Sequence, residues 1–161
     1  MLTLLIVDID PDIMRTIHLV LLNLQHSELN KKGQLKVILH FRGDKAVELD
    51  MMKPIDQEYH EFDEAFKGLE SVDADFTAAL NMDGAGRVIV MSPEGRRRGL
   101  DEVFKEAGRH ATVVVGGFTE GDYVSEVYSH ADYKVSLGDQ LLKIPDVIKQ
   151  VIENYEKGLE E

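Results

Sequence analysis

Residues 113–123 read Val-Val-Val-Gly-Gly-Phe-Thr-Glu-Gly-Asp-Tyr, a short apolar run that ends in a glycine-rich loop. The run from Ala111 to Val115 is rich in β-branched residues, which predicts a buried strand with the loop at its carboxyl end. Glycines in such a loop let backbone groups approach a flat ligand closely, although they also occur in ordinary turns between a strand and a helix. The stretch therefore predicts a strand that ends in a candidate binding loop.

Two further strands with glycine-containing loops are predicted in the same half of the chain. Arg87 to Met91 leads into Met91-Ser92-Pro93-Glu94-Gly95, and Tyr133 to Ser136 leads into the loop 136–142. Helical patterns near 99–106 and 122–128 separate the predicted strands. Strands that alternate with helices predict an α/β fold with a mostly parallel sheet, helices on both faces and binding loops at the carboxyl ends of the strands.

The rest of the chain fits the same fold class. A strand over Leu2 to Val7 ends at Asp8, and an amphipathic helix follows from Pro11. The other predicted elements are strands at 34–40 and 46–49 joined by a turn at 42–45, helices at 58–69 and 74–81, and a final helix with an apolar stripe formed by Ile144, Val147, Ile148, Val151, Ile152 and Tyr155.

Length and composition predict a single domain over residues 1–161 with a cytoplasmic location. No apolar run is long enough for a membrane helix, and the absence of cysteine excludes disulfides and thiolate nucleophiles. The net charge of −12 disfavours non-specific binding to DNA, so any RNA contact must use a local basic patch. The sequence has no dinucleotide fingerprint, P-loop, metal-ligand motif or serine-hydrolase elbow.

Taken together, these loops resemble the cofactor half of the SPOUT methyltransferases. The similarity is to the ribosome-biogenesis (essential-for-mitotic-growth) family, which methylates N1 of a pseudouridine in small-subunit ribosomal RNA. Val-Ile-Val-Met-Ser-Pro-Glu-Gly at 88–95 is similar to that family's Ser-Pro-x-Gly loop, and 113–123 is similar to its Gly-Gly-Phe-x-x-Gly-Asp-Phe motif. Leu21-Leu22-Asn23, 29–33 and His40-x-Arg42-x-Asp44 resemble its upstream segments in the same order.

The resemblance implies a carboxyl-terminal trefoil knot, with a cofactor-binding region at about 87–158. It also implies that S-adenosylmethionine is the cofactor, that small-subunit rRNA or the pre-ribosome is the partner, and that the protein is a homodimer with the last helix at or near the interface. A plain core helix explains the apolar stripe of that helix equally well. The implied cofactor-binding residues are Met91, Val115, Gly116, Gly117, Phe118, Gly121, Ser136, Leu137, Leu141 and Leu142.

The resemblance also implies catalytic and RNA-binding residues. Asp10-Pro11-Asp12-Ile13 is similar to the family's Arg-Pro-Asp-Ile motif and makes Asp12 the candidate general base, with helix capping as its alternative role. The candidate RNA-binding residues are Arg42, Lys53, Arg96, Arg97 and Arg98. For the three consecutive arginines, a solvated charge run is the alternative interpretation.

Two other functions are compatible with the sequence. Asp10 stands where the family has Arg, and Ile55 stands where it tends to have another Arg, which permits a cofactor-binding ribosome-assembly factor without catalysis. The opening residues also resemble a phosphorelay receiver, with Asp8 and Asp10 as metal carboxylates and Asp50 as the phosphoacceptor.

Overall fold

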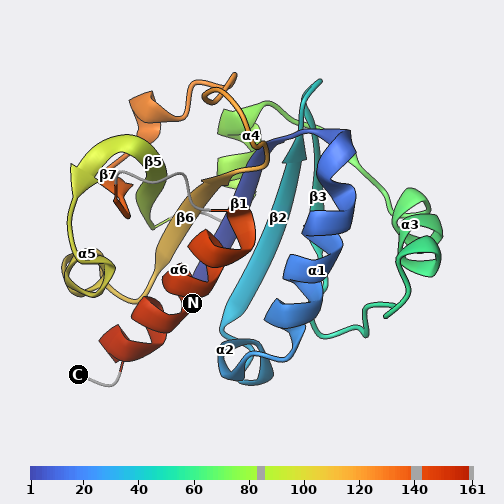
Figure 1. The fold of residues 1–161 in the computed structure, drawn as a ribbon, viewed down its shortest axis with the longest axis horizontal. Helices are drawn as coiled ribbons and strands as arrows, with labels where there is room; N and C mark the ends of the chain where they lie inside the picture. The colour runs from blue at the N-terminus through green and yellow to red at the C-terminus, as the bar shows by residue number, and fades with distance from the viewer. Residues whose placement is uncertain (83–85, 139–142, 160–161) are drawn as a thin grey trace.

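The computed structural model describes residues 1–82, 86–138 and 143–159, in which seven strands form one sheet in the order β4-β3-β2-β1-β6-β5-β7 (Figure 1). The strands are β1 (Leu2–Ile9), β2 (Leu35–Phe41), β3 (Lys45–Leu49), β4 (Val72–Asp73), β5 (Arg87–Arg97), β6 (Ala111–Gly116) and β7 (Tyr133–Ser136). Neighbouring strands from β2 through β1, β6 and β5 to β7 are parallel, whereas β3 and β4 are antiparallel to their neighbours. The predicted α/β fold with a mostly parallel sheet is confirmed.

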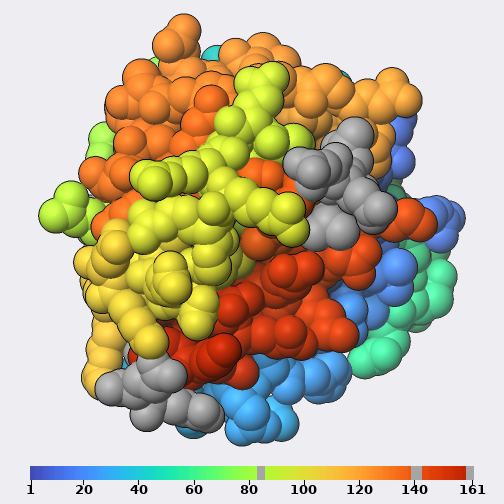
Figure 2. Space-filling model, turned by 60° about the vertical axis from the view of Figure 1, so that its left-hand side comes forward, coloured from blue at the N-terminus to red at the C-terminus, as the bar shows by residue number. Residues whose placement is uncertain are grey.

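Different helices pack on the two faces of the sheet. The helices are η1 (Pro11–Ile13), α1 (Met14–Gln25), α2 (Glu28–Lys31), α3 (Tyr59–Lys67), α4 (Phe76–Asn81), α5 (Leu100–Ala107), η2 (Tyr128–His130) and α6 (Ile144–Leu159). Because side chains alternate along a strand, Leu4 and Ile6 pack with α1, α5 and α6, while Leu5 and Val7 pack with α4 and Val127. In Figures 1 and 2, α6 lies between α5 and α1.

The apolar stripe of α6 is used inside this chain. Ile144, Ile148, Val151 and Tyr155 are buried in the larger core cluster, and the Tyr155 hydroxyl donates to the Arg109 carbonyl at 2.6 Å. The stripe is therefore explained by the core alone, and it is not evidence for a dimer.

Two predictions about the second half of the chain are wrong. The segment 122–128 is not a helix, because the backbone N–H groups of Val124 and Ser125 donate to the distant Asp8 carboxylate instead. The loop predicted to follow Met91 is a continuation of β5, which pairs with β7 again after a register shift between Met91 and Arg96. Strand β4 was not predicted, because its two residues carry no periodic pattern.

The predicted knot depends on how the chain passes from β7 to α6. Residues 139–142 of that connection lie outside the described residues, so the knot stays a prediction. In the part of the chain that the structure describes, no helix is both long and apolar enough to cross a membrane.

Candidate cofactor and RNA site

A pocket lies where the carboxyl ends of β6 and β7 meet the middle of β5 and the start of α6. The predicted cofactor residues that line it are Met91, Val115, Gly116, Phe118, Gly121, Ser136 and Leu137. Leu141 and Leu142 were also predicted to line it, but they lie outside the described residues. The structure thus brings together residues from all three loops singled out in the sequence.

Gly117 does not line this pocket but packs against the end of β1. Its N–H donates to the Val7 carbonyl at 2.8 Å, and its carbonyl accepts from the Asp10 N–H at 2.9 Å. A Cβ atom at this position would lie 2.5 Å from Ile9 Cγ1 and 2.8 Å from Ile9 Cα. Glycine is therefore required here for the close approach of two backbone segments.

The chemistry of the pocket favours a ligand that is partly apolar and not anionic. Val115, Leu137 and Ile144 give it apolar walls, and the hydroxyls of Ser92 and Ser136 add polar atoms. Among the described residues that line the pocket, Asp122 is the one charged side chain, and none is Lys or Arg. A carboxylate without nearby lining cations disfavours a phosphate and tolerates a cationic group.

Tyr123, which lines the pocket, and Tyr128, which packs against Tyr123, were not singled out from the sequence. The rings of Phe118, Tyr123 and Tyr128 make successive edge-to-face contacts, with centroids 5.3 and 5.7 Å apart. The Tyr123 hydroxyl donates to the Met91 carbonyl at 2.7 Å, and burial raises the pKa of this phenol well above its usual value. Both phenols are therefore hydrogen-bond donors at neutral pH.

Tyr128 is anchored to the charged wall of the pocket. Its hydroxyl donates to Asp122 Oδ1 at 2.6 Å and lies 3.0 Å from Ser92 Oγ. Burial and the hydrogen bond to Asp122 raise the pKa of Tyr128 to about 12. These contacts connect the loop after β6 with the middle of β5.

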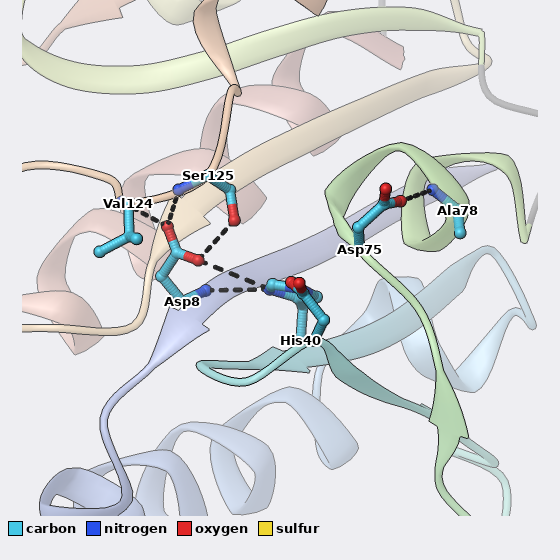
Figure 3. Close-up of polar contacts among 7 residues, drawn as sticks. Asp8, His40, Asp75, Ala78, Val124 and Ser125 are labelled. Atoms are coloured by element: carbon cyan, nitrogen blue, oxygen red, sulfur yellow. Dashed lines mark hydrogen bonds and ion pairs between the residues drawn. The ribbon is translucent and has the colours of Figure 1, made fainter.

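Asp8, at the end of β1, has a buried carboxylate that the sequence analysis considered only for the receiver. Its Oδ2 accepts from the Val124 and Ser125 N–H groups at 2.7 and 2.8 Å, and its Oδ1 accepts from Ser125 Oγ at 2.6 Å (Figure 3). The side chain of His40 lies on its other side. A single acidic residue directly after an apolar run was the only sequence signal for this position.

Arg42, Asp10 and Phe118 lie together beside the pocket. The Arg42 guanidinium is 3.6 Å from Asp10 Oδ2, and its carbon is 5.8 Å from the centroid of the Phe118 ring. Phe118 also lines the pocket, so it separates the pocket from the exposed Arg42 side chain. This arrangement places a cation next to the candidate cofactor site.

Asp12 does not have the helix-capping role considered as its alternative. Asp10 is the residue that caps η1, because its Oδ1 accepts from the Asp12 N–H at 3.0 Å. The Asp12 side chain itself is exposed. Its role as a general base stays a prediction.

The other predicted RNA-binding residues lie apart from Arg42. The Lys53 carbonyl accepts from the Gln25 side chain at 2.6 Å, so Lys53 lies at the end of α1 that is far from Asp10. Arg96 and Arg97 are exposed on β5, and Arg98 pairs with Glu106 at 2.8 Å. The basic residues therefore do not form one patch in this chain.

The receiver interpretation is wrong. Its phosphoacceptor and metal carboxylates would have to share one edge of the sheet. Because β3 is antiparallel to β2, Asp50 at the end of β3 lies at the edge where β1 and β2 begin, opposite Asp8 and Asp10.

Comparison with known proteins gives a consistent family. A model of the family described as EMG1/NEP1 methyltransferase matches residues 6–156. The "Ribosomal RNA small subunit methyltransferase Nep1" of Methanothrix thermoacetophila is 32% identical over 160 residues, which covers 91% of this chain and 69% of that protein. The Nep1 protein of Thermoplasma acidophilum is 28% identical over 166 residues, covering 92% of this chain and 71% of that protein.

Solved structures show the same fold. A crystal structure of Archaeoglobus fulgidus Nep1 bound to S-adenosylhomocysteine has a TM-score of 0.73 and 22% sequence identity, covering 94% of this chain and 72% of that one. A probable methylase family protein from Haemophilus influenzae has a TM-score of 0.61 at 12% identity, over 99% of this chain and 64% of that one. With the family match across nearly its whole length, this chain belongs to the EMG1/NEP1 methyltransferase family.

Proposed function

We propose that this chain is an S-adenosylmethionine-dependent methyltransferase that modifies N1 of a pseudouridine in small-subunit ribosomal RNA. The observation that carries the proposal is the glycine-lined pocket, which has one carboxylate and no cationic residue among the described residues that line it. Family membership, the rRNA methyltransferases among its relatives, and the S-adenosylhomocysteine in a structure of the same fold support the proposal.

The residues of the pocket fit this cofactor. Val115, Leu137 and Ile144 offer apolar surface to an adenine ring, and Gly116 leaves backbone atoms exposed in the pocket wall. Asp122 tolerates the positive charge of a sulfonium, on which the cofactor carries the methyl group that it supplies. In this proposal Leu141 and Leu142 are also cofactor-binding residues, and Gly117 contributes by holding the loop against β1.

The substrate side of the proposal rests on Arg42. Its guanidinium lies next to Phe118, so a phosphate held by Arg42 would keep the RNA beside the pocket. Arg96, Arg97, Arg98 and Lys53 serve as secondary phosphate contacts. Asp12 accepts the proton of the pseudouridine N1 as this nitrogen is methylated, which would be general base catalysis.

A homodimer and a cytoplasmic location are part of the same proposal. A dimer brings two copies of Arg42 and of the β5 arginines onto one assembly, which can concentrate basic side chains locally although each chain has a net charge of −12. Sedimentation equilibrium of the purified protein would measure the association directly.

The test is methyl transfer from S-adenosylmethionine to two RNA hairpins that differ only by uridine or pseudouridine at one position. We expect methylation of the pseudouridine hairpin alone, and we expect Asp12→Asn to lower the turnover rate while leaving cofactor affinity unchanged. Cofactor binding without transfer to any pseudouridine RNA would instead identify an assembly factor. Absence of cofactor binding would contradict the proposal.

A further inference from the structure

Asp8 occupies a backbone conformation that side chains rarely adopt. Its φ angle is +57°, in the left-handed region, and the pairing of β1 with β2 shifts register between Ile6 and Ile9. Such a conformation is unfavourable for residues other than glycine and persists only where surrounding contacts stabilise it. The hydrogen bonds of the Asp8 carboxylate are the contacts that stabilise this conformation.

The carboxylate holds the far end of the pocket loop. Asp8 is 2% exposed, and its two oxygens accept the three hydrogen bonds from Val124 and Ser125 that Figure 3 shows. The loop leaves β6 at Gly116, where Gly117 bonds to β1, and it returns to β1 at Val124 and Ser125. Asp8 and Gly117 thus fasten the two ends of the segment that contains Phe118, Gly121 and Asp122.

The opposite side of Asp8 reaches the turn that carries Arg42. The Asp8 N–H donates to His40 Nδ1 at 3.3 Å, and the same nitrogen is 3.7 Å from Asp8 Oδ1. His40 is fully buried, and its Nε2 lies 3.3 Å from Asp44 Oδ1, within the turn between β2 and β3. With Nδ1 accepting, the Nε2 proton is available to Asp44.

We propose that Asp8 is a positioning residue that holds the cofactor loop through Val124 and Ser125 and the Arg42 turn through His40. The inference rests on the proposed function and assigns to it a residue that is not part of the pocket lining. Hydrogen bonds to a buried carboxylate are among the stronger ones in proteins, so they favour one conformation of the loop. If the loop adopts that conformation only part of the time, cofactor affinity falls in proportion.

The first experiment measures S-adenosylhomocysteine binding by titration calorimetry. Asp8→Asn keeps the shape and the tolerance of a positive φ but removes the charge and one acceptor oxygen. We expect it to weaken binding by about tenfold, because the competent loop population falls to about a tenth. Ser125→Ala removes a single hydroxyl and should produce a smaller loss, which provides a milder variant if Asp8→Asn does not fold.

Matched controls separate positioning from general instability. Asp75→Ala removes the cap that Asp75 Oδ1 provides to the Ala78 N–H at 2.8 Å, also visible in Figure 3, so it should lower the melting temperature without changing cofactor affinity. Ser129→Ala removes an exposed hydroxyl that donates to the Glu126 carbonyl, and it should change neither the melting temperature nor the cofactor affinity. If Asp8→Asn binds within twofold of wild type, or weakens binding no more than Asp75→Ala does, the positioning role is wrong.

The second experiment tests the link to the RNA side with a pseudouridine hairpin. His40→Phe keeps a ring but removes both nitrogens, so we expect it to weaken hairpin binding more than S-adenosylhomocysteine binding. Ser125→Ala should weaken S-adenosylhomocysteine binding more than hairpin binding. Equal hairpin affinity in wild type and His40→Phe overturns this link, whereas a wild-type protein that does not bind S-adenosylhomocysteine overturns the proposed function itself.

Discussion

The pocket and the neighbouring Arg42 region differ in how they are built. The pocket is lined by the middle of β5, the ends of β6 and β7, the segments that follow β6 and β7, and the start of α6. Its walls are mainly glycines and apolar side chains. The Arg42 region combines an exposed arginine with Asp10 and Phe118 from two other parts of the chain. We infer that the fold itself forms the cofactor site, whereas the RNA side depends on a few exposed side chains.

The largest effect is expected for a change at the junction of the two regions. Gly117→Val places new atoms within 2.8 Å of the Ile9 backbone, so it must separate the cofactor loop from β1. Overpacking of this kind costs about 1–3 kcal/mol of stability. Thermal unfolding should show a lower stability, and cofactor titration should show a lower affinity. A variant with wild-type stability would contradict the close packing.

A smaller and more local effect is expected at the neighbouring glycine. A Cβ at Gly116 would lie 2.9 Å from two atoms of the Phe118 ring, which can move because it is a side chain. Gly116→Ala should therefore displace this ring and weaken S-adenosylhomocysteine binding by about tenfold, equivalent to about 1.4 kcal/mol, with little loss of stability. Unchanged affinity would mean that the position of Phe118 does not matter for binding.

A change in the exposed Arg42 region should affect RNA binding and not cofactor binding. Arg42→Ala is expected to weaken binding of the pseudouridine hairpin and to lower the slope of log affinity against log salt by about one, because one phosphate contact is lost. Cofactor affinity should stay the same. Lys53→Ala, at the other end of α1, is the comparison, and an equal loss in both variants would show that Arg42 has no special position.

The smallest effect concerns the protonation of Tyr128, which contacts the pocket residues Tyr123 and Asp122. The pKa of Tyr128 is raised to about 12 from its usual value of 10.0, so above pH 10 the unfolded chain loses this proton before the folded chain does. The unfolded state then binds fewer protons, and the free energy of unfolding falls as pH rises from 10 towards 12. Denaturant unfolding at several alkaline pH values should show a shallower fall for Tyr128→Phe, and identical slopes would contradict this.

The strands and most pocket residues were predictable because their signals are local. A run of β-branched residues followed by glycine marks the end of a strand, and parallel strands bring such ends together. The motif at 113–123 therefore predicted a loop at this edge of the sheet, and Gly116, Phe118 and Gly121 of that loop line the pocket.

The contacts between distant segments were not predictable from such patterns. Asp8 and Ser125 are 117 residues apart in sequence, and their hydrogen bonds override the helical pattern at 122–128. Gly117 looked equivalent to Gly116 in the motif, yet it packs against Ile9 on a strand from the start of the chain. In both cases the role of the residue depends on contact with a segment that is distant in the sequence.

The most direct test is a crystal structure of this protein grown with S-adenosylhomocysteine. We predict ligand density in the pocket between Met91, Gly116 and Leu137, with the Asp8 contacts to Val124 and Ser125 intact. Ligand density at any other site, with this pocket filled by protein side chains, would contradict the assignment of the pocket as the cofactor site.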